Sequence, residues 1–233
     1  QAGACDADTE AAVRRHRQGW DHLLNGRAPR ERDAAVGPFI ESSWHQSPPY
    51  NNDCPQGSGG GTCVVGCVAT SAAMIMKYWE FPDYGEGSHS YQWGGDDSCG
   101  SNEGGGTLLA NFSDSYDWDN ILHSYGGGST AQQRAAAAEL NFEVAVAFEM
   151  DFGVCASGTY VSIGTGIYPE YFRYSEDIEF LHRNAYDADG WWERIRKEMD
   201  AFPPRPIHYR INKHSIICDG YQEDGGERYY HMN

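Results

Sequence analysis

The fold of this chain is decided at residues 59–79, which read GGGTCVVGCVATSAAMIMKYW. A glycine-rich loop comes first, and from Cys67 onward Ala, Met and Ile fall on nearly every side of a helical period. A helix that is apolar all round is buried in a protein core. We therefore predict a buried helix that begins at or near Cys67 and ends before Pro82, because proline cannot continue a helix.

Cys67 would then occupy the first turn of this helix. The unsatisfied backbone N–H groups and the helix dipole at that end stabilise a thiolate. Gly66, directly before it, carries no side chain that would block a substrate. Acyl transfer by a thiolate also needs an imidazole, a group that orients the imidazole, and donors for the developing oxyanion. The position of Cys67 thus predicts a nucleophile whose partners lie elsewhere in the chain.

His214 is the imidazole that fits this role best. It opens a strand-like segment 147 residues after Cys67 (214 − 67), and Asn233 ends the next strand-like segment. Two adjacent antiparallel strands could bring these two side chains together, and an amide oxygen would fix the ring tautomer. Papain-type enzymes have an early Cys and a His and an Asn at comparable distances downstream.

The remaining patterns predict an α+β protein with a helical lobe and an antiparallel sheet lobe. A capping box, Thr130 with Gln133, opens a third helix, and residues 83–106 read as irregular. The order is helices first and strands later, without regular βαβ alternation. Further helices are predicted at 9–24 and from Asp189 to Pro203, and strands at 142–150, 206–211, 214–221 and 228–233.

The composition excludes several classes of partner. The 233 residues have a formal net charge of −17 and a pI near 4.7, so nucleic acids and anionic membranes are disfavoured. No apolar run approaches the roughly 20 residues of a membrane span. Hydrophobic residues make up 40% of the chain, enough to build a sizeable core.

Seven cysteines favour a secreted protein with some disulfides. Cys54 and Cys63 flank a flexible loop and are the most plausible local pair, whereas the connectivity of the others is not readable. Cys218 lies in an apolar strand and is predicted to be an inert buried thiol. Zinc is disfavoured because the Cys54, Cys63 and Cys67 spacing has no His pair nearby, so we expect no metal.

Six segments together resemble the streptopain-like cysteine proteases, secreted bacterial peptidases with the papain-like two-lobe fold. The resemblance covers residues 37–233. The segments that carry it are GPFIESSWHQSPPYNNDCP (37–55), GGGTCVVGCVATSAAMIMKYW (59–79), GSHSYQW (87–93), YDWDNIL (116–122), VAFEMDFGVCASGT (146–159), and RPIHYRINKHSIICDGYQ to YYHMN (205–233).

The resemblance implies a role for each candidate residue. Cys67 would be the nucleophile, His214 the general acid and base, and Asn233 the residue that orients the imidazole. Gln46 would contribute its uncharged side-chain amide to the oxyanion hole together with the Cys67 backbone N–H. No cofactor is implied.

The resemblance also implies a substrate site and partners. Ser157, Gly158 and Thr159 correspond to the wall that binds the peptide backbone, and Gly66 borders the same site. The substrate would be a protein or peptide, and a propeptide or protein inhibitor would be a further partner, because such proteases are made as zymogens. The expected location is outside a bacterial cell.

Two features depart from the family pattern. Family members commonly have glycines before the catalytic His, whereas Asn212 and Lys213 stand here; Asn tolerates left-handed conformations, so the turn is expected to survive. The family also continues beyond the position of Asn233 into a Trp-Gly-Trp-Gly-Gly segment and further strands. We therefore expect a peptidase domain at 37–233 that lacks its C-terminal strands, preceded at 1–36 by an extension or a propeptide remnant.

Three functions are consistent with these residues. The first is a cysteine endopeptidase that works through an acyl-enzyme. The second is a catalytically impaired relative that binds peptides or a partner in the same cleft. The third is an acyltransferase or cell-wall amidase with the same Cys-His pair.

Overall fold

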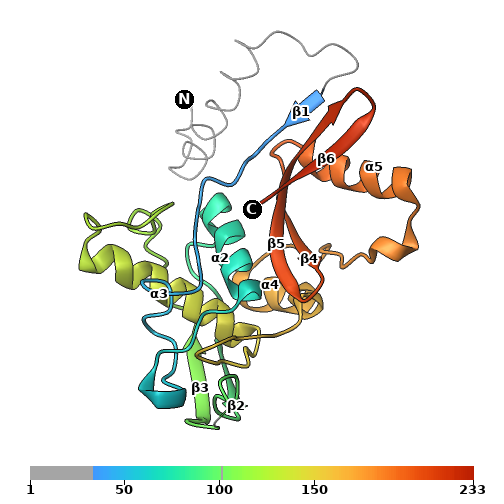
Figure 1. The fold of residues 1–233 in the computed structure, drawn as a ribbon. Helices are drawn as coiled ribbons and strands as arrows, with labels where there is room; N and C mark the ends of the chain where they lie inside the picture. Colours follow the sequence, from blue (N-terminus) through green and yellow to red (C-terminus); the bar gives the residue numbers. More distant parts are fainter. Residues whose placement is uncertain (1–33, 101) are drawn as a thin grey trace, which may run out of the picture.

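Helix α2 (Cys67–Trp79) lies centrally in the computed structural model, which describes residues 34–100 and 102–233 (Figure 1). Every residue from Val68 to Lys77 is buried. The helix ends where Glu80 takes a left-handed conformation (φ 44°), before Pro82. The predicted buried helix and its start at Cys67 are confirmed.

Helix α3 (Ala131–Ala147) packs against α2 and opens with the predicted capping box. The Thr130 hydroxyl accepts from the Gln133 N–H at 3.1 Å, and the Gln133 side chain accepts from the Thr130 N–H at 2.8 Å. The helix continues to Ala147, so the strand predicted at 142–150 is wrong. Residues 144–148 are apolar and buried without a break, and such a run fits a buried helix as well as a strand.

Two further helices lie later in the chain. Helix α4 (Gly164–Phe172) was not predicted, because its opening glycines and the internal Pro169 hide the helical pattern. Helix α5 (Ala188–Met199) is capped by Asp187, whose carboxylate accepts from the Gly190 N–H at 2.7 Å. It therefore begins one residue before Asp189, where the sequence placed it. Short 3₁₀ turns lie at Ser58–Gly60 (η1), Val161–Ile163 (η2) and Arg183–Ala185 (η3).

The antiparallel sheet is built around the long strand β5 (His214–Asp224). It pairs with β1 (Ala34–Val36), β4 (Ile207–Ile211) and β6 (Glu227–Met232). The strands predicted at 206–211, 214–221 and 228–233 are confirmed with small shifts at their ends. Ile217 belongs to the core around α2, whereas the next residue, Cys218, belongs to a second core under α5. Strand β5 is apolar on both faces because each face is covered by a helix.

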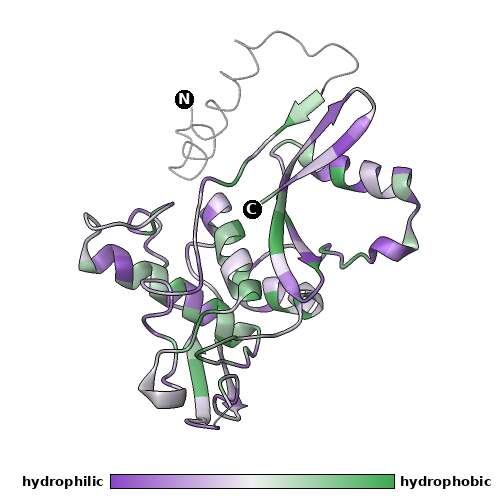
Figure 2. Cartoon of the chain, in the orientation of Figure 1, coloured by the Kyte–Doolittle hydropathy of each residue, from purple (hydrophilic) through white to green (hydrophobic). Residues whose placement is uncertain are grey.

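A second, two-stranded sheet lies in the stretch predicted to be irregular. It consists of β2 (Ser88–Trp93) and β3 (Gly106–Asn111) and packs against α3. The architecture is thus α+β, with α2, α3 and the small sheet on one side and the four-stranded sheet with α5 on the other (Figure 1). Figure 2 shows hydrophobic residues along α2 and the middle of β5, where the two parts meet.

Two sequence expectations need separate mention. The helix predicted at 9–24 falls outside the described residues. Of the helices that are described, none is long and apolar enough to cross a membrane.

The predicted pairing of Cys54 with Cys63 is wrong, because both are buried free thiols. The loop between them is closed by backbone instead, with the Cys63 N–H donating to the Pro55 carbonyl at 2.9 Å. Within the described residues the disulfide joins Cys99 to Cys155. A disulfide needs a specific geometry of the two cysteines, which closeness in sequence does not provide. Cys99 and Cys155 are 56 residues apart in the sequence, but they meet where two loops touch.

Candidate active site

A cleft of about 470 Å³ opens between the start of α2 and the start of β5. It brings together Cys67, His214, Gln46 and Ser157, all of which the sequence singled out. The other lining residues are Ser47, Val64, Cys155, Ala156 and Lys213.

Cys67 is the first residue of α2, and its thiol is half-buried at the cleft. The Ser215 backbone N–H lies 3.4 Å from the Cys67 Sγ and donates to it. A thiolate at this point receives that hydrogen bond and faces the open N–H groups of the helix end. The other free thiols of the described chain are buried; burial raises the pKa of Cys63 to about 11 and that of Cys218 to about 12.

Gly66 sets the position of Cys67 through its backbone. Its φ is 91°, a region that residues with a side chain rarely adopt. A Cβ at this position would lie 2.6 Å from the Sδ of the buried Met150. The helix start therefore needs glycine for both its conformation and its space.

His214 stands at the first position of β5, opposite Ile211 of β4, and is exposed to solvent. The two-residue turn before it survives without glycine. Lys213, rather than the expected Asn212, takes the left-handed conformation, with φ 57°. This turn places the imidazole and the Lys213 side chain on the rim of the cleft.

Gln46 ends the segment 37–46, which we call the strap because it runs from the sheet to the cleft. The Val65 N–H donates to the Gln46 carbonyl at 3.0 Å, which fixes Gln46 beside the chain that leads into Cys67. The Trp44 indole donates to the Leu122 carbonyl at 2.9 Å, and the Ser43 N–H donates to the His123 carbonyl at 2.9 Å.

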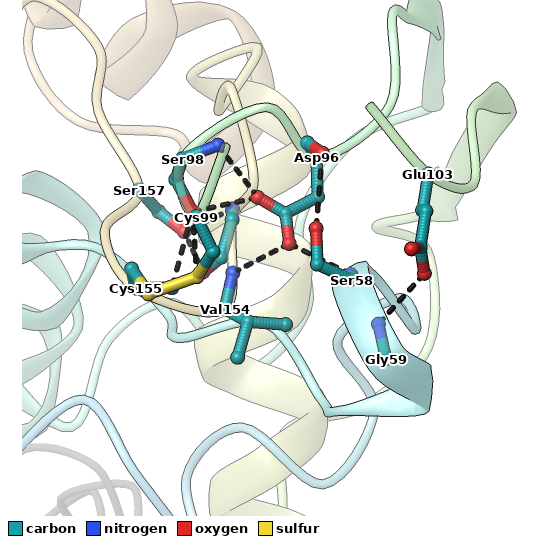
Figure 3. Close-up of a disulfide and its surroundings, with 10 residues drawn as sticks. Ser58, Gly59, Asp96, Ser98, Cys99, Glu103, Val154, Cys155 and Ser157 are labelled. Atoms are coloured by element: carbon teal, nitrogen blue, oxygen red, sulfur yellow. Dashed lines mark hydrogen bonds between the residues drawn. A yellow bond between two sulfur atoms is a disulfide. The ribbon is translucent and has the colours of Figure 1, made fainter. Parts of the chain in front are cut away.

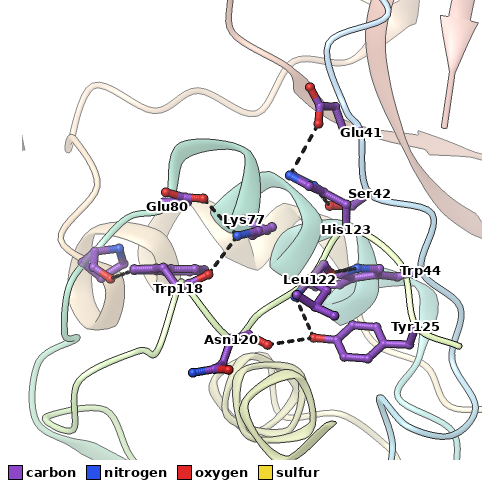
Figure 4. A network of polar contacts seen from close by, with 11 residues as sticks. Glu41, Ser42, Trp44, Lys77, Glu80, Trp118, Asn120, Leu122, His123 and Tyr125 are labelled. Atoms are coloured by element: carbon purple, nitrogen blue, oxygen red, sulfur yellow. Dashed lines mark hydrogen bonds and ion pairs between the residues drawn. The ribbon is translucent and has the colours of Figure 1, made fainter. Parts of the chain in front are cut away.

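The strap is bonded to residues 118–123, and this segment is itself anchored to α2. The buried Lys77 ammonium bonds the Glu80 carboxylate at 2.9 Å and the Trp118 carbonyl at 3.0 Å (Figure 4). The Ser42 hydroxyl lies 3.2 Å from the His123 Nδ1, and burial lowers the pKa of His123. Gln46 is therefore positioned by polar contacts along the strap, from Ser42 to Gln46 itself.

Asn233 does not line the cleft in this structure. Its side-chain NH₂ donates to the Ser42 carbonyl at 3.3 Å and approaches the Ile40 carbonyl at 3.5 Å. Its backbone pairs with Ile217, so it continues β6 along β5. Among the described residues, the hydrogen bonds of its amide go to the strap and not to the imidazole of His214.

The predicted wall is only partly at the cleft. The Ser157 hydroxyl donates to the Val64 carbonyl at 2.6 Å, whereas the Thr159 hydroxyl turns inward to the Phe148 carbonyl at 2.7 Å. Gly158 pairs through its backbone with Asp151. Cys155 and Ala156 were not singled out as cleft residues, nor was the Ser215 N–H. The one signal for them was their position beside Ser157 and His214.

Comparison with known families agrees with this geometry. The family model described as the Peptidase C10 family matches residues 44–233. This chain belongs to the Peptidase C10 family. All four residues gathered at the cleft lie within the matched region.

Several members of the C10 family have similar sequences. The thiol protease/hemagglutinin PrtT of Porphyromonas gingivalis is 26% identical over 225 residues, which are 91% of this chain and 25% of that protein. Streptopain of Streptococcus pyogenes is 27% identical over 203 residues, 82% of this chain and 50% of that protein. The chain therefore spans half or less of these relatives' lengths.

Two solved structures have the same fold. The active wild-type interpain A cysteine protease of Prevotella intermedia superposes with a TM-score of 0.71 at 26% identity, covering 88% of this chain and 89% of that one. A prointerpain A fragment superposes with a TM-score of 0.72 at 24% identity, covering 97% of this chain and 74% of that one.

Proposed function

We propose that this chain is a cysteine endopeptidase that hydrolyses peptide bonds through an acyl-enzyme. The observation that supports this most is the shared cleft of Cys67, His214 and Gln46, with the thiol at a helix N-terminus. Membership of the C10 family and the likeness to streptopain and interpain A support the same reaction.

In the proposed mechanism the Cys67 thiolate attacks the peptide carbonyl carbon, and a C–S bond forms as the carbonyl oxygen becomes an oxyanion. The Gln46 side-chain NH₂ and the Cys67 N–H, whose position at the helix start leaves it without an intrahelical acceptor, would donate to that oxygen. Protonated His214 gives its proton to the leaving amine as the C–N bond breaks. His214 then takes a proton from water, which attacks the thioester and releases Cys67.

Asn233 remains the proposed orienting residue for His214. Its NH₂ donates to the strap carbonyls, which leaves Oδ1 as the atom that would accept from the imidazole. Ser157 and Gly158 are proposed to bind the peptide backbone, with Gly66 leaving room for it. Thr159 would support this wall through its bond to the Phe148 carbonyl.

Two further proposals concern the setting of the enzyme. The Cys99–Cys155 disulfide supports a location outside the cytosol. The likeness to a prointerpain A structure, whose name marks a precursor, supports synthesis as a zymogen with a propeptide partner.

A peptidyl epoxide directed at cysteine proteases tests the function. We expect hydrolysis of denatured protein, and a single adduct that maps to Cys67 in an intact-mass measurement. Cys54, Cys63 and Cys218 are internal controls, because burial protects them from the reagent. His214→Ala should abolish both hydrolysis and the adduct, whereas His182→Ala, an exposed histidine away from the cleft, should change neither.

The alternatives predict different results. A peptide-binding relative would bind peptides without forming the adduct or cleaving them. An acyltransferase or amidase would form the adduct but leave denatured proteins intact. Either result would overturn the endopeptidase proposal.

A further inference from the structure

Three loops that are far apart in the sequence meet at one carboxylate, that of Asp96. The side chain has no exposed surface. Its Oδ1 accepts from the Ser98 hydroxyl at 2.6 Å and the Ser98 N–H at 2.9 Å, and its Oδ2 accepts from the Ser58 N–H at 2.8 Å and the Val154 N–H at 3.2 Å (Figure 3). These bonds, that of the Ser98 hydroxyl first, hold the pKa of Asp96 well below its usual range.

Two of these loops, those of Asp96 and Val154, are joined a second time by the Cys99–Cys155 disulfide, whose Cα atoms are 5.6 Å apart. The Cys155 N–H also donates to the Ser98 hydroxyl at 3.1 Å. Cys155 lines the cleft together with Cys67. Asp96 and the disulfide thus fasten a piece of the cleft lining to a loop behind it.

The loop that carries Asp96 is a firm support. The Asp96 N–H donates to the Glu103 carbonyl at 2.7 Å, and the Glu103 N–H returns a bond at 3.1 Å. The Glu103 side chain accepts from the Gly59 N–H at 2.7 Å, which ties the support to the η1 turn. The Asp96 loop is therefore fixed by Glu103 and by η1, and any segment bonded to the loop is held through it.

The cleft wall, which we define as residues 153–159, is held on two sides. Its inner side is held near Cys67, because the Val64 N–H donates to the Gly153 carbonyl at 3.0 Å and the Ser157 hydroxyl donates to the Val64 carbonyl. Its outer side, Val154 and Cys155, is held by Asp96 and the disulfide. Within the described residues, nothing in the proposed mechanism uses these outer contacts.

We propose that Asp96 and the Cys99–Cys155 disulfide are positioning residues that hold the cleft wall against the backbone of a bound peptide. This inference rests on the proposed function. They act through the wall and touch no reacting atom, so their loss should weaken peptide binding and leave the chemistry of Cys67 intact. A prepositioned wall spares a peptide the ordering of that segment on binding.

The disulfide also makes peptide affinity sensitive to thiols. Both of its cysteines are exposed. A thiol reductant that keeps Cys67 reduced can attack the same bond: its thiolate forms a mixed disulfide with one cysteine and releases the other, and a second reductant thiol then frees the first and leaves as a disulfide. Reductant should therefore loosen the wall while it keeps the nucleophile active.

The test compares Cys99→Ser/Cys155→Ser and Asp96→Asn with the wild type. Asp97→Asn is the matched control, because it removes the same charge from an exposed neighbour. Hydrolysis of a fluorogenic peptide gives kcat and KM, and the peptidyl epoxide gives its saturation constant and its limiting rate on Cys67. Amide hydrogen exchange follows the wall directly.

We expect KM and the epoxide saturation constant to rise about tenfold in both variants, with kcat and the limiting alkylation rate within about twofold of wild type. Exchange at Val154 and Cys155 should quicken, and Asp97→Asn should match the wild type. Wild type treated with reductant until the disulfide opens should behave as the double variant does.

Unchanged KM and saturation constants in the double variant would overturn the inference, as would a fall in kcat without a rise in KM. If Asp96→Asn does not fold, the double variant decides alone, because its two positions are exposed. If the wild type cleaves no peptide, the proposed function fails, but hydrogen exchange at Val154 and Cys155 still reports whether the wall is held: faster exchange in the double variant supports the inference, and no change overturns it.

Discussion

His208 is a neutral histidine on β4, the strand that pairs with the start of β5. Its Nε2 lies 2.7 Å from the Ser215 hydroxyl and its Nδ1 3.0 Å from the Tyr168 hydroxyl. Burial lowers the pKa of His208 to about 4. The unfolded chain takes up a proton on this ring near pH 6.5, whereas the folded chain does so only near pH 4, so the contribution of His208 to stability falls as the pH drops between these values.

The measurement is the free energy of unfolding against pH for wild type and His208→Gln. We expect the difference between the two profiles to fall by about 3 kcal/mol from pH 7 to pH 4. A single profile would not suffice, because burial raises the pKa of Glu143 to about 8 and makes stability fall as the pH rises from about 4.5 to 8. A flat difference profile would contradict this, because it would mean that the folded chain protonates His208 as readily as the unfolded chain does.

The start of α2 sets the position of Cys67, the proposed nucleophile. Gly66→Ala forces a side chain into a φ of 91° and against the Sδ of Met150. We expect the free energy of unfolding to fall by about 2–4 kcal/mol, from the backbone strain and the overpacking together. Cys67 should also be displaced, so that alkylation by the peptidyl epoxide slows.

Gly158→Ala is the matched control for this prediction. A Cβ at Gly158 meets no atom within 4 Å, and its φ is not in the left-handed region. Urea unfolding should show a change within about 0.5 kcal/mol for this variant. Equal losses in the two variants would contradict the role given to Gly66.

Helices and strands were predictable from the sequence where the hydrophobic period agreed with residues that start or stop an element. The α2 run and the Thr130 capping box each combine a pattern with a stop or start signal, and the structure has both. Helix α4 and the β2–β3 hairpin lie in stretches rich in glycine or polar residues, where packing and not pattern decides. The strand predicted at 142–150 failed because burial on every side removes the period on which such a prediction depends.

The candidate site shows the same division. Cys67, His214 and Gln46 were found through a helix start, a strand start and a family resemblance, and the cleft brings them together. Asp96 and the Cys99–Cys155 disulfide were missed as parts of a site, because their partners come from loops 38 to 58 residues away. No local pattern records such contacts.

At the scale of the whole molecule, one buried carboxylate joins the sheet to the strap that ends at Gln46. Asp219 lies on β5 with no exposed surface. Its Oδ2 accepts from the Phe39 N–H at 3.0 Å and the Ile40 N–H at 2.8 Å, and its Oδ1 lies 2.6 Å from the His231 Nδ1. The strap, the central strand and β6 therefore meet at this side chain.

Asp219→Asn keeps the shape of the side chain but removes its charge. It also places an NH₂ group where a carboxylate oxygen now faces the Phe39 and Ile40 N–H groups or the His231 ring. Hydrogen bonds to charged groups contribute about 1.5–3 kcal/mol each, so we expect the free energy of unfolding to fall by about 3 kcal/mol in urea titrations at pH 7. Because the strap carries Gln46, kcat should fall more than KM rises. Asp224→Asn, an exposed carboxylate on the same strand, should leave both stability and kcat near wild type. Lost stability with unchanged kcat would show instead that the contacts of the strap with Val65, Leu122 and His123 are enough to hold Gln46. The two parts of the molecule would then be coupled for folding but not for catalysis.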